Sequence, residues 1–288
     1  MTPRRRQSVE GHYPNLSIRD IVSDGHVICC RNPAGRVFAK KDAIRIDCGW
    51  SDFNELPGTI DRVLAEEKAR TERNPAAWDA EFGYLSPDPQ FCGHNIFIGC
   101  IMHLEALNLL GDLKLVLAGL DALRINCWGF DMESVRDVAH LYRLENRFSL
   151  GLPLNELIAR VTTVYQDLGL QEINARIHLV EEDKRIFADA IARALAVLRS
   201  ARLISPWELV DILSPIRMAA SMGFLSGITK EEVDDFTFSQ LDEPVVPAPH
   251  TAEEERARDR RDADFADRMN LRFADVCLNA RGRKLLEP

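Results

Sequence analysis

The sequence predicts an α+β unit followed by a unit that contains helices only. Short β-rich runs alternate with helical stretches as far as about residue 180, and from Glu181 onward the apolar residues keep helical spacing alone. The chain has 288 residues, of which 46% are hydrophobic and 28% are charged. A chain of this length and composition can bury a sizeable core, so we expect two packed units.

Strands and helices alternate in the first half of the predicted α+β unit. Apolar clusters in residues 27–48 are interrupted at residues 32–35 by Asn-Pro-Ala-Gly, which predicts a hairpin with its turn at that point. A helical stripe follows in residues 60–68, and a second helix is predicted around residues 76–82.

The second half of this unit continues the alternation. A β-rich run at residues 95–104 precedes a helix predicted over residues 107–120, and strand-like runs follow at residues 123–130 and 139–150. Pro153 then opens a helix at its favoured first position, and Gly169 predicts where that helix stops.

The helical unit carries clear start signals. A helix is predicted over residues 186–198, and residues 205–208 (Ser-Pro-Trp-Glu) and 229–232 (Thr-Lys-Glu-Glu) are capping boxes that predict two further helix starts. Residues 244–249 read as a stiff proline-rich linker, and residues 253–272 as a highly charged helix that we interpret as a solvated arm.

These patterns predict four regions in the chain. They are a flexible tail at residues 1–16, an α+β domain at residues 17–180, a helical domain at residues 181–241, and the linker with its charged helical arm at residues 242–288.

Composition excludes several classes of function. The net charge of −9 argues against a nucleic-acid binder, and no apolar run approaches the roughly 18 residues that a membrane span needs. The seven cysteines form no C-x-x-C pair, and the spacing of Cys92, His94, Cys100 and His103 fits no common zinc motif, so no metal site is predicted. We therefore expect a cytoplasmic protein without membrane or nucleic-acid partners.

Several segments resemble the ATP:guanido phosphotransferases in matching order. They are residues 39–48, similar to the family's Asn-Glu-Glu-Asp-His-Leu-Arg-Ile-Gln-Cys; residues 83–89, similar to Gly-Tyr-Leu-Thr-Ser-Cys-Pro; residues 128–133, similar to Arg-Gly-x-x-Gly-Glu; and residues 144–151, similar to Ile-Ser-Asn-Gln-x-Thr-Leu-Gly. The helical unit is similar to the C-terminal domain of bacterial protein-arginine kinases. The resemblance covers about residues 17 to 241 and implies an antiparallel sheet flanked by helices, followed by an all-helical domain.

The resemblance also implies where the chemistry of the family would lie. These enzymes hold the ATP phosphates with arginines and place carboxylates on the guanidinium, so that transfer depends on positioning and charge stabilisation. One such carboxylate falls on Lys41, the family cysteine on Asp88, and two phosphate-binding arginines on Phe97 and Trp128.

Only Arg45 and Glu133 keep the family's residue types in register. We expect these two residues and the four substituted ones to converge on one concave surface. Losing two arginines weakens phosphate binding by about 3 to 6 kcal/mol, at roughly 1.5 to 3 kcal/mol for each charge-assisted hydrogen bond. The resemblance therefore predicts a degenerate active site.

Other residues leave two interpretations open. Arg45 either contacts phosphate or pairs with an acid such as Asp47, and Glu133 is either a working base or a solvated acid. Arg143 and Arg147 replace family glutamines, and they either rebuild part of the phosphate cage or form surface salt bridges. A similar choice, between binding phosphoarginine and pairing with neighbouring charges, applies to Asp189, Arg193, Arg202 and Arg217.

Three functions follow as hypotheses. The first is a catalytically silent, kinase-like binding or regulatory protein that needs no cofactor. The second is a divergent phosphotransferase that uses Glu133 and Mg-ATP, with a phosphate cage re-formed from Arg45, Arg143 and Arg147. The third is a structural subunit that pairs with an active homologue. A protein partner or a homo-oligomer is expected in the first and third cases.

Overall fold

The computed structural model describes most of the chain, and it describes side chains from Leu56 onward. The described residues are 21–24, 27–30, 36–40, 43–47, 56–72, 75–86, 89, 92–94, 96–129, 138–148, 150–241 and 251–286. No helix among these residues is long and apolar enough to cross a membrane.

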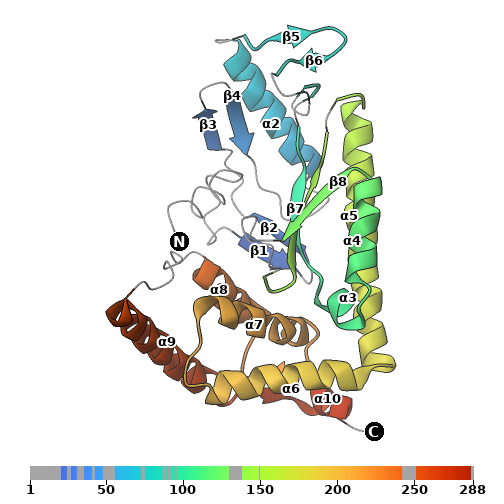
Figure 1. The fold of residues 1–288 in the computed structure, drawn as a ribbon. Coiled ribbons are helices and arrows are strands. Elements are labelled where there is room, and N and C mark those ends of the chain that lie inside the picture. The colour runs from blue at the N-terminus through green and yellow to red at the C-terminus, as the bar shows by residue number, and fades with distance from the viewer. Residues whose placement is uncertain are drawn as a thin grey trace.

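A five-stranded antiparallel sheet lies at the centre of the first unit (Figure 1). In spatial order its strands are β1 (Ile21–Asp24), β2 (Val27–Cys30), β7 (Gly99–His103), β9 (Leu141–Asn146) and β8 (Ile125–Gly129). Every neighbouring pair of strands is antiparallel. The predicted fold class, an antiparallel sheet flanked by helices with a helical region after it, is confirmed.

Helices cover one face of this sheet (Figure 1). They are α3 (Glu105–Leu110), α4 (Leu113–Ala122) and α5 (Leu154–Glu181). Because side chains alternate along a strand, Met102 and Leu144 lie on the face that joins the main core with Leu157 and Leu168 of α5. The opposite face carries the next residues in each strand, and the candidate site lies there.

Two helix boundaries differ from the sequence prediction. The single helix expected over residues 107–120 is broken between α3 and α4 at Gly111, which has a φ of 84°. By contrast, α5 runs through Gly169 to Glu181. The cost of a glycine in a helix, about 1 kcal/mol, is offset there because Leu168, Ala175 and Leu179 continue to bury one face of the helix.

Two smaller hairpins correct earlier expectations. The strand β2 pairs with β1 and β7, whereas β3 (Arg36–Lys40) pairs with β4 (Ala43–Asp47), so the hairpin predicted to turn at residues 32–35 is wrong. The strands β2 and β3 belong to two different sheets.

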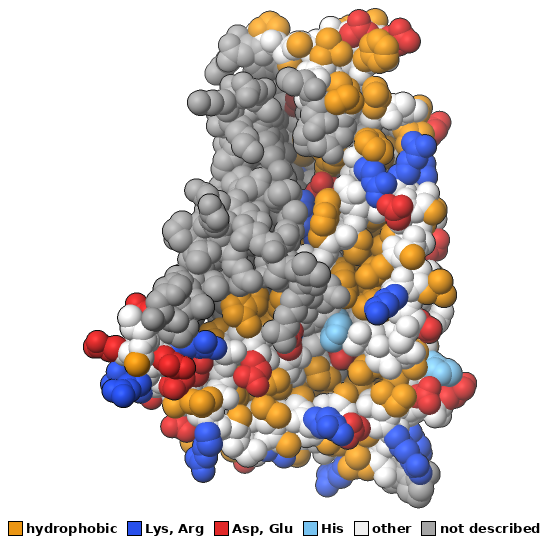
Figure 2. Space-filling view, viewed as in Figure 1, with side chains coloured by type: hydrophobic (Ala, Val, Ile, Leu, Met, Phe, Trp, Pro, Cys, Tyr) orange, Lys and Arg blue, Asp and Glu red, His pale blue; other side chains and the backbone are white. Residues whose placement is uncertain are grey.

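The helix predicted around residues 76–82 is also wrong. Strand β5 (Trp78–Asp79) pairs with β6 (Gly83–Tyr84), beyond helix α2 (Leu56–Thr71). The Asp79 carboxylate accepts hydrogen bonds from the backbone N–H groups of Glu81 and Phe82, which favours a turn over a helix. Hydrophobic side chains gather at this end of the molecule (Figure 2), where Trp78, Phe82 and Leu85 are exposed.

The second region is mainly helical, as predicted, although a short pair of strands departs from the expected helices-only pattern. It contains α6 (Lys184–Ser200), α7 (Pro206–Ser221), α8 (Lys230–Leu241) and α9 (Ala252–Arg272), with a short pair of strands, β10 (Leu225–Ser226) and β11 (Cys277–Leu278), then α10 (Ala280–Arg283) and the 3-10 helix η3 (Lys284–Leu286). Ser205 and Thr229 accept hydrogen bonds from the N–H groups of Glu208 and Glu232, so both predicted helix starts are confirmed.

Helix α9 does not behave as the solvated arm that its charge suggested. Phe265, Ala266 and Met269 are buried on one of its faces, and the helix packs on α6. Three apolar residues at helical spacing are enough to hold a helix whose remaining surface is charged. The predicted domain bounds themselves stay predictions.

Candidate functional site

The candidate site lies on the sheet face that does not pack on α5. On this face Arg143 of β9 stands in register between Ile101 of β7 and Trp128 of β8. Glu145 follows two residues later on the same face, opposite Gly99, which contributes no side chain. The strands therefore bring a cation, an acid and an indole together on β9 and the edge strand β8.

These three residues form what we call the Trp128–Arg143–Glu145 cluster. The Arg143 guanidinium carbon lies 5.2 Å from the centre of the Trp128 ring, and its Nη2 donates to Glu145 Oε2 at 2.6 Å. Arg143 is only 4% exposed. Its charge is therefore neutralised by a neighbouring acid and shielded by an aromatic ring, an arrangement that stabilises a cation without offering it to a ligand.

Phe97 lies just before β7, in a segment whose backbone is fixed on both sides. The Asn146 amide accepts from the Ile98 N–H at 2.6 Å and donates to the Ile96 carbonyl at 3.1 Å. Tyr165 of α5 also donates to the Ile98 carbonyl at 2.6 Å. Phe97 itself is half-buried, so its place is set by buried polar contacts to its neighbours.

Arg147 forms a pair with an acid, as one of its two interpretations predicted. It donates through Nε to Asn126 Oδ1 at 2.9 Å and through Nη2 to the exposed carboxylate of Asp121. This confirms a surface salt bridge for Arg147. Arg143, for which the same two interpretations were open, is paired as well, but with Glu145 on the sheet face and almost fully buried.

Six residues were expected to converge on one surface, and the side-chain positions of four of them are not described. Lys41, Asp88 and Glu133 lie outside the described residues, and for Arg45 only the backbone is described, in β4 opposite Phe38. Their meeting with Phe97 and Trp128 on one surface stays a prediction.

In the helical unit, the residues considered for phosphoarginine lie in different environments. Asp189 and Arg193 pair with each other at 2.6 Å on an open face of α6, where the Arg193 side chain is 78% exposed. Arg202 is also exposed. Arg217, however, is 2% exposed and donates to Asp234 Oδ1 at 2.6 Å, and burial lowers the pKa of its guanidinium against the attraction of Asp234. Arg217 thus joins α7 to α8.

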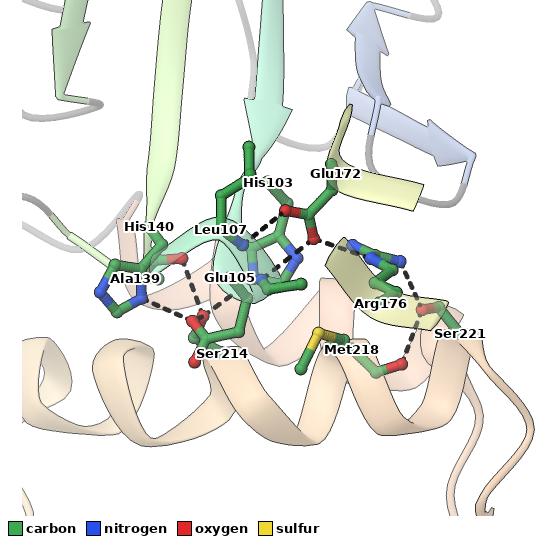
Figure 3. Close-up of polar contacts among 11 residues, drawn as sticks. His103, Glu105, Leu107, Ala139, His140, Glu172, Arg176, Ser214, Met218 and Ser221 are labelled. Atoms are coloured by element: carbon green, nitrogen blue, oxygen red, sulfur yellow. Dashed lines mark hydrogen bonds and ion pairs between the residues drawn. The ribbon is translucent and has the colours of Figure 1, made fainter. Parts of the chain in front are cut away.

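A buried polar network, which we call the interface cluster, connects the sheet unit with the helical unit (Figure 3). Ser214 of α7 lies 2.8 Å from His103 Nε2, and its hydroxyl donates to the carboxylate of Glu105. The Nδ1 atom of His140 lies 2.5 Å from Glu105 Oε2. Serine, histidine and carboxylate are the groups of a hydrolytic triad, but here all three are at most 3% exposed, so the arrangement holds two units together.

A second part of the interface cluster surrounds Glu172 of α5 (Figure 3). Its carboxylate accepts from the N–H groups of Ala106 and Leu107 at the start of α3, both at 3.1 Å, and from Arg176 Nε at 2.7 Å. Burial raises the pKa of Glu172, whereas Arg176 and the two amides lower it. Arg176 also donates to Ser221 of α7 at 3.1 Å, so α3, α5 and α7 share one network.

The interface cluster was largely missed at the level of sequence. Of its members, only His103 was considered for a role from the sequence, as a possible metal ligand, whereas Glu105, Glu172 and Ser214 were not. One signal was available, because Glu172 stands among Leu168, Ala175 and Leu179 on the apolar stripe of a helix, where a charge needs a partner. Within the described residues, no group of three His, Cys, Asp or Glu side chains could hold a metal ion.

Comparisons with known proteins agree with this architecture. Residues 38–175 match the family described as ATP:guanido phosphotransferase, C-terminal catalytic domain, and residues 184–273 match the protein-arginine kinase McsB C-terminal domain. The two matches follow each other along most of the chain. Both regions of the chain thus match domains of the ATP:guanido phosphotransferases.

Individual relatives carry the name protein-arginine kinase. The one from Clostridium acetobutylicum is 27% identical over 198 residues, covering 68% of this chain and 57% of that protein. The one from Caldanaerobacter subterraneus is 23% identical over 248 residues, covering 82% of this chain and 70% of that protein. The chain thus spans little more than half the length of the first of these relatives.

A solved structure also matches. It is the duplicated taurocyamine kinase from Schistosoma mansoni with bound transition state analogue components, at 14% identity and a TM-score of 0.42, covering 70% of this chain and 31% of that one.

Proposed function

We propose that this chain is a kinase-like member of its family that does not transfer phosphate and acts by binding a protein partner in the cytoplasm. The matches to this family support the kinase-like part. The remainder is supported by the side chains that stand where the family places its phosphate-binding arginines, and by what the nearest arginine on the same sheet face contacts.

The Trp128–Arg143–Glu145 cluster is the observation that carries this proposal. Trp128 stands at the position of a family arginine and offers one indole N–H in place of five guanidinium donors. Arg143, its cross-strand neighbour, donates to Glu145 and is buried. A triphosphate at this face would have to displace Glu145 from Arg143, and the acid would then repel it.

A divergent phosphotransferase is the competing proposal. It requires a cage in which Arg143 and Arg147 turn toward the nucleotide together with Arg45. The contacts of Arg143 with Glu145 and of Arg147 with Asp121 and Asn126 count against that cage, because each pair would have to break before the arginine could reach Mg-ATP. A third possibility, a structural subunit of an active homologue, shares the binding role and differs in the identity of the partner.

Phosphate transfer is the direct test. Labelled ATP with Mg²⁺ is offered with free arginine, creatine or an arginine-rich protein, and the protein-arginine kinase of Clostridium acetobutylicum is assayed in parallel as the positive control. We expect incorporation by the control alone. Transfer by this chain that is lost in Glu133→Gln would establish the divergent enzyme and overturn the proposal.

Partner binding is tested separately. The tagged chain is co-expressed with an intact protein-arginine kinase and purified through its tag. The mass of the purified species is then measured by light scattering. A stable mixed complex supports the subunit form of the proposal. A protein that stays monomeric and also transfers phosphate contradicts both binding forms.

A further inference from the structure

The turn that leads into β9 has a backbone conformation that its own residues do not favour. Residues 138–141 form a β-turn closed by a hydrogen bond from Leu141 N–H to the Val138 carbonyl at 3.0 Å. The two central residues, Ala139 and His140, have φ values of 52° and 51°. Consecutive positive φ angles belong to type I′ turns, which favour Asn-Gly or Gly-Gly. The turn therefore needs support from outside.

Helix α7 of the helical unit supplies that support. Asp211 Oδ1 accepts a hydrogen bond from the Ala139 N–H at 2.9 Å, and Ser214 Oγ lies 3.0 Å from the Ala139 carbonyl oxygen. Asp211 and Ser214 are three residues apart, so they lie on the same face of α7. Both backbone polar groups of Ala139 are thus in contact with one helix.

The surroundings of the turn reinforce the contact with α7. Leu104 N–H donates to the His140 carbonyl at 2.9 Å, which connects the turn to the end of β7. Val138, Ala139 and Leu141 form a separate apolar cluster with Ile101 of β7 and Val210 of α7. Ser214 also contacts Glu105, which contacts His140 (Figure 3). The turn is therefore enclosed between the sheet and α7.

The turn opens the strand that carries the candidate site. Leu141 is the first residue of β9, and two residues later on the same face is Arg143, which contacts Trp128 and Glu145. We propose that Asp211 is a positioning residue through which the helical unit sets the start of β9 and hence the Trp128–Arg143–Glu145 cluster. A change in the position of α7 then changes the position of this cluster on the sheet face. This inference holds whether or not the chain transfers phosphate.

The first part of the proposal is that Asp211 sets the start of β9. Hydrogen exchange measured by mass spectrometry on the full chain tests it. Asp211→Ala removes the acceptor for Ala139 N–H, and we expect exchange in peptides covering residues 138–146 to rise by about tenfold, with α5 and α6 unchanged. Asp211→Asn keeps an acceptor oxygen and should restore protection to within about threefold of the wild type. Asp235→Ala, at an exposed aspartate of α8, is the matched control and should change nothing.

A glycine variant tests whether turn strain is what Asp211 offsets. Ala139→Gly accepts a positive φ without strain, so the increase caused by Asp211→Ala should shrink to less than about half in that background. The same background should rescue folding if Asp211→Ala alone does not fold. An equal increase in both backgrounds would contradict the role of Asp211 in the turn.

The second part of the proposal is that Asp211 also sets the Trp128–Arg143–Glu145 cluster, and testing it requires a signal from Trp128 itself. The chain is labelled with 5-fluorotryptophan, and the Trp128 resonance is assigned with Trp128→Phe. Asp211→Ala should shift or broaden that resonance, whereas Asp235→Ala and Asp211→Asn should leave it in place. A Trp128 resonance that stays unchanged while the turn loses protection would overturn the coupling. An equal rise in hydrogen exchange across all helices would show that Asp211 stabilises the whole protein and has no specific role in the turn.

Discussion

The guanidinium of Arg143 lies over the indole of Trp128, 5.2 Å from the ring centre, and the two residues are directly opposite each other in adjacent antiparallel strands. This pairing covers the guanidinium of Arg143 with an aromatic ring. Glu145, on the same face, pairs with this guanidinium and neutralises its charge. On this sheet face the guanidinium is thus part of an ion pair that lies beside an aromatic ring.

The ion pair between Arg143 and Glu145 should contribute to stability. Glu145→Gln keeps the shape of the side chain but removes its charge beside a guanidinium that is almost fully buried. We expect the free energy of unfolding to fall by about 1 to 3 kcal/mol, measured by urea denaturation. Asp267→Asn, at an exposed position of α9, is the control and should stay within about 0.5 kcal/mol. Equal stability of the two variants would show that Arg143 is not held by Glu145.

Restoring the two family arginines should not restore the enzyme. In the double variant Phe97→Arg and Trp128→Arg, the new guanidinium at position 128 faces Arg143 across the strands, and like charges directly opposite destabilise a sheet. Loss of two half-buried aromatic rings adds about 1 to 2 kcal/mol each. Thermal melts should show a lower midpoint that Mg-ATP does not raise. A nucleotide-dependent rise with recovered transfer would mean that only two residues separate the site from function.

Arg217 and Arg193 should respond to substitution in opposite ways. Arg217→Met leaves Asp234 in a buried site beside Lys230 and should cost about 2 to 5 kcal/mol in the free energy of unfolding. Arg193→Met removes only an exposed pair on α6 and should cost less than about 1 kcal/mol. If Arg217→Met unfolds normally but loses binding to a phosphoarginine peptide, its contact with Asp234 is secondary to a ligand role.

Tyr84 should titrate well above an ordinary tyrosine. Its hydroxyl donates to Glu67 of α2, and this hydrogen bond, with partial burial, raises the pKa of Tyr84 from 10.0 to about 12. Because the folded pKa is the higher one, the stability contributed by this bond is present below pH 10 and is lost as the pH rises toward 12. In Glu67→Gln the pKa should return toward 10.0.

Carbon-13 NMR of labelled tyrosine measures this shift, with Tyr84→Phe to assign the signal. At about pH 11 the Tyr84 hydroxyl should be mostly protonated in the wild type and mostly ionised in Glu67→Gln. Ionisation of both near pH 10 would show that the Tyr84–Glu67 hydrogen bond does not form in solution.

Local sequence signals predicted where helices and strands lie better than they predicted which strands pair with each other. The capping boxes at Ser205 and Thr229 marked true helix starts, because each depends on residues within one turn. The hairpin assigned across residues 32–35 was wrong because β2 pairs instead with β7, some seventy residues further along the chain. Gly169 did not stop α5, since tertiary burial outweighed its low helix propensity.

The candidate site was predictable only in part. Trp128 and Phe97 were singled out because the resemblance placed arginines there, and a salt bridge was one of the two interpretations given for Arg147. The strand predicted over residues 139–150 places Arg143 and Glu145 on one face, but their burial beside Trp128 depends on the pairing of β9 with β8, which the sequence does not show. The role of Asp211 was also hidden, because Ala139 and His140 give no sign in sequence of adopting positive φ angles.

Calorimetric titration with Mg-ATP tests most directly whether the site has lost its function. If two phosphate-binding arginines have become Trp128 and Phe97 and Arg143 is held by Glu145, affinity should be lower by about a hundredfold or more than in an intact protein-arginine kinase titrated alongside. We predict no saturable heat up to about 1 mM nucleotide. Saturable binding as tight as that of the intact kinase, abolished by Arg143→Met, would contradict this account and assign Arg143 to a working phosphate cage.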